Sequence, residues 1–179
     1  MEQIFSTKER IDIIEAIIFQ TGPIGVNFIA SELKLSKGLV SKYFNILVKQ
    51  GILKRLGTKF SITDSPLTKA VKILLNIRKF DTKIFKKYSF VESVGLYGSC
   101  ARGENTEDSD TDIWLKIKKT EDRFLASLTS ELNKKVSNIK VLFLTEDKIN
   151  KLKKEDALFY YALAFGSITL YGEKDAIQL

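Results

Sequence analysis

The feature that most constrains the fold of this sequence is VGLYGSCARGENTEDSDTDIWLKI, residues 94–117, in which two apolar runs enclose a small turn and a pair of acids. The first run, VGLY, is typical of a buried strand and ends directly in Gly98 and Ser99. Asp110 and Asp112 then enter the second run, IWLKI. Because residues two apart in an extended chain point to the same side, we expect the two carboxylates to converge. The pattern predicts one strand that delivers the turn and another that carries the acids.

These residue types suit the binding of a phosphate together with a divalent cation. Glycine lets the backbone approach an anion closely, and Ser99 adds a hydroxyl beside the amides of the turn. Arg102 follows three residues later and could neutralise the same anion with its fork of donors. Two converging carboxylates repel one another unless a cation lies between them, and Mg²⁺ prefers hard oxygen ligands combined with substrate phosphates. The sequence therefore predicts a Mg²⁺ site at Asp110 and Asp112.

In this order and at this spacing, the residues resemble the nucleotidyltransferase family related to DNA polymerase beta. That family's pattern is a Gly-Ser turn followed about ten residues later by Asp-x-Asp on a strand. The motifs G-S-x-A-R-G-E and S-D-x-D are most similar to those of the minimal nucleotidyltransferases of archaea and bacteria. The likeness extends to an apolar helix near residues 156–165, which precedes ITLYG at 168–172.

The resemblance implies a small mixed sheet flanked by helices. It also implies an enzyme that transfers a nucleoside monophosphate to a hydroxyl group of a protein or nucleic acid. The residues implied to bind the nucleotide are Gly98, Ser99, Arg102 and Ser109. Those implied to act in catalysis, by holding one or two Mg²⁺ or Mn²⁺ ions, are Asp110 and Asp112. The implied substrate is an NTP, and we expect ATP. Minimal nucleotidyltransferases often resemble antitoxins that modify a cognate toxin, so a partner protein is one expected acceptor.

The sequence departs from the family pattern at the third carboxylate, which the family usually supplies from a later strand. The candidate strand, residues 139–144, carries Lys140 at the expected acidic position. A lysine beside two carboxylates competes with a second metal ion for their charge. Three outcomes stay open: an acid such as Glu104 or Glu107 substitutes, solvent deprotonates the acceptor, or the domain binds nucleotide without turnover. The chain has no histidine, which excludes an imidazole base.

Residues 1–63 have the pattern of three short helices followed by a hairpin. Apolar side chains at helical spacing predict helices that begin near residues 6, 27 and 36, and ILKRLGTKFSI at 52–62 predicts two strands around Gly57. Together with that hairpin, FIASELKLSKGLVSKYFNILVKQGILKR resembles the winged helix-turn-helix family. On the outer side of the third helix and on the wing, the residues expected to contact DNA are Lys37, Ser41, Lys42, Asn45, Lys54, Arg55 and Lys59.

The charge distribution favours a polyanionic partner for the first half of the chain. The net charge is +4 over residues 1–63, +5 over 64–90 and −2 over 91–179. The alternatives are a solvated lysine-rich surface and a module that mediates dimerisation or docking, because this fold is widely reused. Winged-helix proteins often dimerise on two-fold DNA, so a homodimer is expected.

Two functions are consistent with these features. The first is a Mg²⁺-dependent nucleotidyltransferase coupled to a DNA-binding domain. The second is a nucleotide-sensing, DNA-binding transcriptional regulator or antitoxin, whose nucleotidyltransferase domain is weak or inactive.

The sequence predicts an α+β protein in three parts. These are a winged helix-turn-helix domain over 1–63, a helical connector over 64–88 and a nucleotidyltransferase domain over 89–179. Ser65-Pro66 is a strong helix start, since serine caps a helix and proline suits its first position. Glycine and serine are scarce in the connector, which argues against a flexible linker.

Several classes of protein are excluded. One cysteine cannot form a disulfide within the chain, and no run approaches the roughly 18 apolar residues of a membrane span. The N-terminus, MEQIFSTKER, lacks the pattern of a secretory signal, and we expect a cytoplasmic protein with no membrane partner. Cys100 is expected to be buried rather than nucleophilic. Trp114 either stacks on a base or packs in the core.

Overall fold

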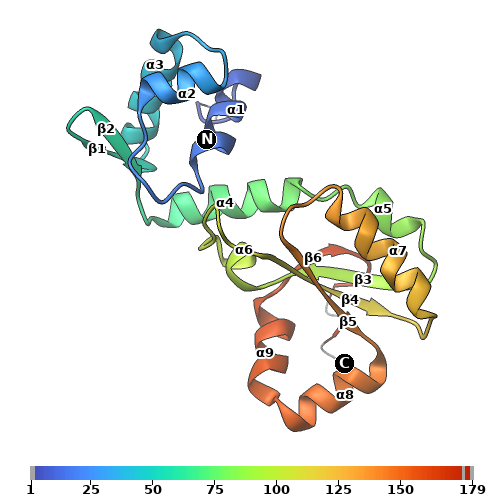
Figure 1. The fold of residues 1–179 in the computed structure, drawn as a ribbon. Helices are drawn as coiled ribbons and strands as arrows, with labels where there is room; N and C mark the ends of the chain where they lie inside the picture. The colour runs from blue at the N-terminus through green and yellow to red at the C-terminus, as the bar shows by residue number, and fades with distance from the viewer. Residues whose placement is uncertain (1–2, 175, 178–179) are drawn as a thin grey trace. The chain divides into compact units, whose positions relative to one another are not determined.

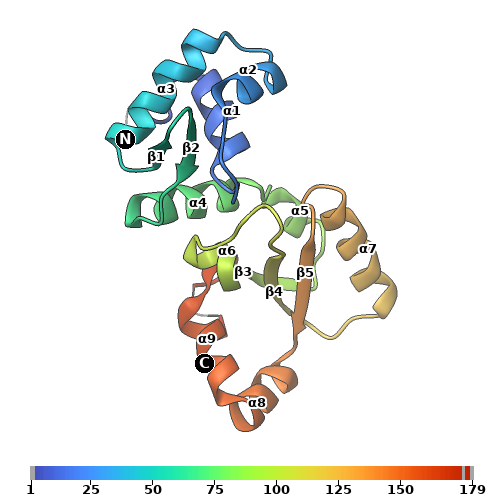
Figure 2. The same cartoon turned by 60° about the vertical axis from the view of Figure 1, so that its left-hand side comes forward.

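The computed structural model describes residues 3–174 and 176–177 and has a mixed α and β architecture (Figures 1 and 2). The expected α+β class, with a small mixed sheet and flanking helices, is confirmed. The chain forms two compact units. The first consists of Met1–Lys72 with Asn105–Asp108, and the second of Ile73–Glu104 with Ser109–Leu179.

The first unit contains three helices and a two-stranded hairpin. The elements are α1 (Lys8–Ile17), α2 (Val26–Glu32), α3 (Lys37–Lys49), β1 (Leu53–Leu56) and β2 (Lys59–Ile62). The helices begin within two residues of the predicted positions, and β1 pairs antiparallel with β2. Gly57, between the strands, has a φ of +58°, which glycine adopts without the steric cost that other residues meet.

The core of the first unit joins the helices to the hairpin. The ring of Phe44 on α3 packs edge-on against that of Phe60 on β2, with 5.0 Å between their centroids. The backbone of Ile24 exchanges hydrogen bonds with that of Phe60 at 2.7 and 2.9 Å. Ser36 caps α3 by accepting a hydrogen bond from the Leu39 amide at 3.2 Å. The hairpin is therefore held by side-chain packing and by backbone pairing.

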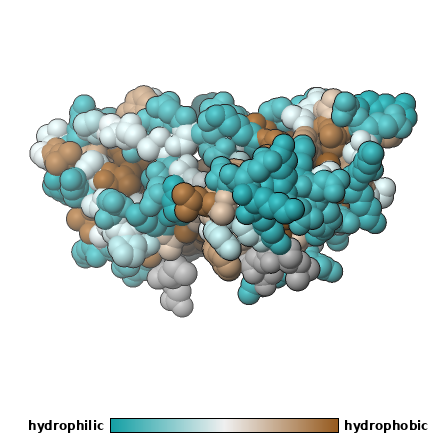
Figure 3. Space-filling model, turned by 90° about the horizontal axis from the view of Figure 1, so that it is seen from below, coloured by the Kyte–Doolittle hydropathy of each residue, from teal (hydrophilic) through white to brown (hydrophobic). Residues whose placement is uncertain are grey.

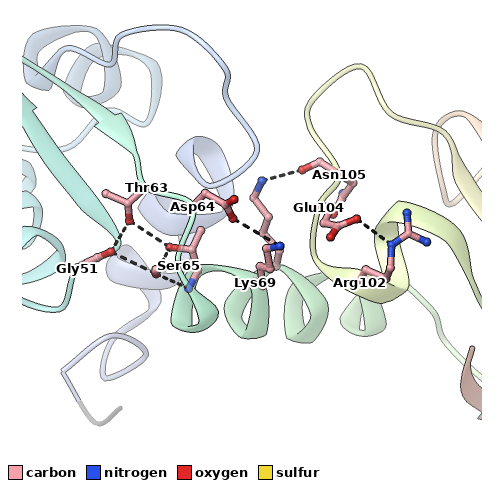
Figure 4. Close-up of polar contacts among 10 residues, drawn as sticks. Gly51, Thr63, Asp64, Ser65, Lys69, Arg102, Glu104 and Asn105 are labelled. Atoms are coloured by element: carbon pink, nitrogen blue, oxygen red, sulfur yellow. Dashed lines mark hydrogen bonds and ion pairs between the residues drawn. The ribbon is translucent and has the colours of Figure 1, made fainter. Parts of the chain in front are cut away.

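Helix α4 (Pro66–Arg78) begins where the sequence predicts a helix start. The Ser65 hydroxyl accepts a hydrogen bond from the Thr68 amide at 3.2 Å. The hydroxyls of Ser65 and Thr63 also donate to the carbonyl of Gly51, which ties the start of α4 to the end of α3 (Figure 4). A short helix, α5 (Lys83–Lys86), follows.

The second unit is built on a four-stranded mixed sheet. Its elements are β3 (Val91–Leu96), α6 (Gly98–Arg102), β4 (Thr111–Ile117), α7 (Asp122–Asn133), β5 (Ile139–Leu144), α8 (Glu146–Glu155), α9 (Ala157–Gly166) and β6 (Ile168–Tyr171). The strand order is β5-β4-β3-β6. β4 and β5 run parallel, connected through α7, while β3 pairs antiparallel with β4 and β6.

Helices cover both faces of this sheet (Figure 2). On one face, Ile113 and Leu115 of β4 pack with Leu128 of α7. On the other, Trp114 packs with Tyr160 and Leu163 of α9. Because neighbouring residues of a strand point to opposite faces, the part of β4 that is buried on both sides, residues 113–115, has a continuous apolar sequence.

Trp114 has a packing role. Its side chain is 2% exposed, and its Nε1 donates a hydrogen bond to Ser167 Oγ at 2.8 Å. A Cβ atom on Gly95 of β3 would lie 2.3 Å from Cε2 of the indole ring, so this position of β3 admits only glycine. Cys100 is 1% exposed, and burial raises the pKa of its thiol, which confirms the expected buried side chain.

Figure 3 shows a face on which hydrophilic side chains predominate, with smaller hydrophobic patches between them. Among residues 3–174 and 176–177, none of the helices has the length and hydropathy needed to span a bilayer.

Candidate functional site

The turn after β3 lies directly against an aspartate of β4. Gly98 has a φ of +68°, and a Cβ atom on it would lie only 2.8 Å from Asp112 Oδ2. The preceding residue, Tyr97, donates its amide to the Asp112 carbonyl at 3.0 Å. Glycine is therefore needed both for the backbone conformation and for the close approach of the carboxylate.

Asp110 and Asp112 interact electrostatically at the start of β4. Burial raises the pKa of Asp112 above its ordinary value of 3.8, and the negative charge of Asp110 raises it further, while Lys140 lowers it. Both residues are partly exposed. The two carboxylates thus interact at a site that solvent can reach.

Lys140 of β5 is the cation beside these acids. In the parallel pairing of β4 with β5, Lys140 lies opposite Asp112. Its Nζ is 2.5 Å from Asp110 Oδ2, and this hydrogen bond raises the pKa of the lysine. As the sequence indicated, the strand from which the family usually supplies a third carboxylate supplies an ammonium group here.

The other residues expected to bind nucleotide differ from one another in burial and in their partners. Ser99 is partly buried, and its carbonyl accepts a hydrogen bond from the Glu104 amide at 2.9 Å. Arg102, at the end of α6, is exposed and pairs its Nε with Glu104 Oε2 at 2.8 Å (Figure 4). Ser109 is partly exposed and directly precedes Asp110.

The two acids considered as substitutes for a third carboxylate have other partners. Glu104 pairs with Arg102, and Glu107 accepts a hydrogen bond from the Thr21 hydroxyl at 3.1 Å. Within the part of the chain that the structure describes, no three side chains of the types His, Cys, Asp and Glu come together as a metal site. The acidic site is a pair.

This pair fits a divalent cation that is completed by other ligands. Mg²⁺ is usually held by one or two carboxylates together with water and substrate phosphates, and Mn²⁺ also accepts oxygen ligands. Asp110 and Asp112 supply such donors, and the Gly98 turn lies beside them. The donor set suits a cation that arrives with a phosphate ligand better than one held by protein alone.

Tyr97 is a site residue that the sequence analysis did not identify. Its ring packs edge-on against that of Phe159 on α9, with 6.3 Å between the ring centroids. Burial raises the pKa of its hydroxyl, and the negative charge of Asp112 raises it further. The sequence showed it only as the end of an apolar run. Its position directly before the Gly-Ser turn was the available signal.

The residues expected to contact DNA all lie exposed on α3 and the hairpin of the first unit: Lys37, Ser41, Lys42, Asn45, Lys54, Arg55 and Lys59. Two of them are in contact, because Arg55 Nη2 donates to Asn45 Oδ1 at 2.9 Å. The guanidinium of Arg55 also lies over the Phe60 ring, 5.2 Å from its centroid. The hairpin therefore orients Arg55 toward α3.

The chain is similar to known proteins mainly over its second half. The family model described as "Polymerase beta, Nucleotidyltransferase" matches residues 82–175. A Methanocaldococcus jannaschii protein that bears the provisional name protein adenylyltransferase MJ1215 is 33% identical over 73 residues, which cover 41% of this chain and 84% of the relative. A crystal structure of a Sulfolobus solfataricus protein, provisionally named a nucleotidyltransferase, matches with a TM-score of 0.37 at 17% identity. It covers 59% of this chain and 84% of that one, and the score is too low to bear on the fold.

Proposed function

The chain belongs to the polymerase beta nucleotidyltransferase family, and we propose that its second unit is a divalent-metal-dependent nucleotidyltransferase. The proposed reaction moves a nucleoside monophosphate from an NTP to a hydroxyl group of a protein or nucleic acid. The observation that carries the proposal is the approach of the Gly98 turn to Asp112, with Asp110 beside it.

Each part of the site has a separate role in the proposed reaction. The turn of Gly98 and Ser99 binds the triphosphate through backbone amides and a hydroxyl. Asp110 and Asp112 would hold a divalent cation, which would supply charge neutralisation to the phosphates and to the leaving pyrophosphate. The protein acts mainly by positioning and by charge stabilisation, as in other phosphoryl transfers.

The bond changes are those of an in-line displacement at the α phosphorus. The acceptor oxygen forms a bond to that phosphorus, and the bond to the bridging oxygen breaks as pyrophosphate leaves with the electron pair. The chain contains no histidine, and no third acid joins the pair among the described residues. We therefore assign the proton of the acceptor hydroxyl to solvent.

ATP and a protein hydroxyl are the substrate pair that we propose first. The support is the relative from M. jannaschii, whose provisional name is that of a protein adenylyltransferase. A cognate toxin is one form that the protein acceptor would take.

Transfer of labelled nucleotide tests this function. The protein is incubated with each α-labelled NTP, Mg²⁺ or Mn²⁺, and candidate protein and nucleic-acid acceptors. Asp110→Asn and Asp112→Asn are each expected to lower transfer at least about 100-fold, as loss of a charge-stabilising group does. Asp122→Asn, which changes an exposed acid of α7, serves as the matched control. Transfer that persists in both site variants contradicts the assignment.

A second candidate function is favoured by the ion pair between Lys140 and Asp110. We propose that the first unit is a winged helix-turn-helix that binds DNA, as a homodimer on two-fold sites, and that the second unit acts as a nucleotide sensor if turnover is weak. The exposed basic residues of α3 and the hairpin support it. Nucleotide that changes DNA affinity while no acceptor is labelled would favour this function over the enzyme.

A further inference from the structure

A positively charged side chain forms an ion pair with one carboxylate oxygen of the proposed metal site. Lys140 Nζ is 2.5 Å from Asp110 Oδ2, and the strand register also places Lys140 opposite Asp112. Among the described residues, the ammonium group of Lys140 thus serves both carboxylates. The lysine meets the need for a counter-ion that two neighbouring carboxylates create.

A divalent cation and the ammonium group compete for Asp110. Both bind the same carboxylate, and like charges within a few ångströms of one another repel. The side chain of Lys140 is 65% exposed, so it leaves Asp110 with little loss of packing. Lysine is a long, flexible point charge that pairs readily with phosphate. A triphosphate on the Gly98 turn would place an anion beside Asp112, the residue opposite Lys140.

We propose that Lys140 is a positioning residue, an exchangeable counter-ion that holds Asp110 in the nucleotide-free protein and moves to the phosphates when a nucleotide arrives with its divalent cation. This inference rests on the proposed nucleotide site. The exchange makes binding of the cation and of the nucleotide mutually dependent. The nucleotide draws Lys140 away from the carboxylate that the cation needs, and the cation frees Lys140 to pair with the phosphates. The nucleotide-free protein therefore binds divalent cations weakly.

Binding measurements on Lys140→Gln test the exchange. Titration of nucleotide-free protein with Mn²⁺, followed by electron paramagnetic resonance, is expected to show at least about tenfold tighter binding in this variant, since one unit of competing charge is gone. Its affinity for a non-hydrolysable ATP analogue, measured by calorimetry, is expected to fall about tenfold because a charge-assisted hydrogen bond to phosphate is lost. The two shifts have opposite signs, which a purely structural role of the lysine would not produce.

Three further variants serve as controls. Lys140→Arg keeps the charge and is expected to restore weak binding of Mn²⁺ to the nucleotide-free protein. Lys118→Gln removes one charge after the far end of β4 and is expected to change neither affinity. In an Asp110→Asn background, Lys140→Gln is expected to lose its effect on Mn²⁺, since the shared carboxylate is absent. Thermal unfolding of each variant verifies that it folds.

The outcomes separate this inference from the proposed reaction. Mn²⁺ affinity within twofold of wild type in Lys140→Gln, a similar change in Lys118→Gln, or shifts of the same sign for Mn²⁺ and nucleotide would overturn the exchange. Opposite shifts without any nucleotide transfer by the wild type would support the exchange and remove only the proposed reaction. Active wild type with unchanged Mn²⁺ affinity in Lys140→Gln would remove only the exchange.

Discussion

Asp112, an acid of the candidate site, lowers the stability of the fold at neutral pH. Burial and the charge of Asp110 raise its pKa above 3.8, so the folded protein holds the proton more strongly than the unfolded chain does. The stabilising effect of that proton is present at low pH and is lost as the pH rises from 3.8 through the raised pKa. At neutral pH the charged side chain therefore opposes folding, which is common at sites built for binding.

Replacing Asp112 with asparagine is expected to stabilise the protein at pH 7. Asparagine has nearly the same shape and carries no charge, so the unfavourable burial disappears. The gain is at most about 1 kcal/mol, because solvent screens a partly exposed group. Thermal unfolding followed by circular dichroism at pH 7 and pH 4 measures it, and the difference from wild type is expected to shrink at pH 4. A lower unfolding midpoint for the variant at pH 7 would show that Asp112 stabilises the fold.

At the scale of elements, the site depends on the junction between β3 and α6. β3 lies between β4 and β6, and its last residues lead directly into the Gly98 turn. The backbone bond from Tyr97 to Asp112 aligns this turn with the start of β4. The two inner strands of the sheet thus place the Gly98 turn and the acids together.

Gly98→Ala is expected to damage both stability and the site. The φ of +68° disfavours alanine, and the new methyl group would lie 2.8 Å from Asp112 Oδ2. We expect a loss of about 1–3 kcal/mol in the free energy of unfolding, together with weaker binding of nucleotide and Mn²⁺. Gly166→Ala, at the end of α9, is the control, because a Cβ atom there has no heavy atom within 4 Å. Equal effects of the two substitutions on nucleotide binding would refute the role of the turn.

At the scale of the whole molecule, the net charge changes along the chain. Net positive charge is concentrated before residue 91, and the following half, which contains the acid pair, is slightly negative. Each unit has its own secondary structure and its own candidate ligand. A polyanion is the expected partner of the first unit, and a nucleotide is the expected ligand of the second.

DNA binding by the first unit is expected to weaken steeply with salt. Each lysine that contacts a phosphate contributes about −0.9 to the slope of log affinity against log salt concentration. Lys42→Ala and Lys54→Ala should each reduce the slope by about 1, with little dependence on DNA sequence. Lys118→Ala, which changes an exposed lysine of the second unit outside the positively charged half of the chain, is the control. Fluorescence anisotropy with a duplex at several salt concentrations measures this, and a flat salt response would exclude phosphate contacts.

Much of the fold was predictable because its signals are local. Apolar spacing marked the helices of the first unit, Ser65-Pro66 marked the start of α4, and residues 139–144 matched β5. The Gly-Ser turn, the acid pair and the lysine on the later strand were also visible as short patterns. These features depend on residues close together in the chain, where backbone conformation and side-chain periodicity are set.

The sequence alone determined which residues are candidates for the chemistry, and the tertiary structure decided which of them meet. It paired Lys140 with Asp110, paired Arg102 with Glu104, and set Tyr97 near Asp112. Such partners depend on strand order, register and side-chain rotamers, none of which is encoded in a short stretch of sequence. The charge balance of the site follows from those partners, because Coulomb interactions depend on distance in space rather than on separation along the chain.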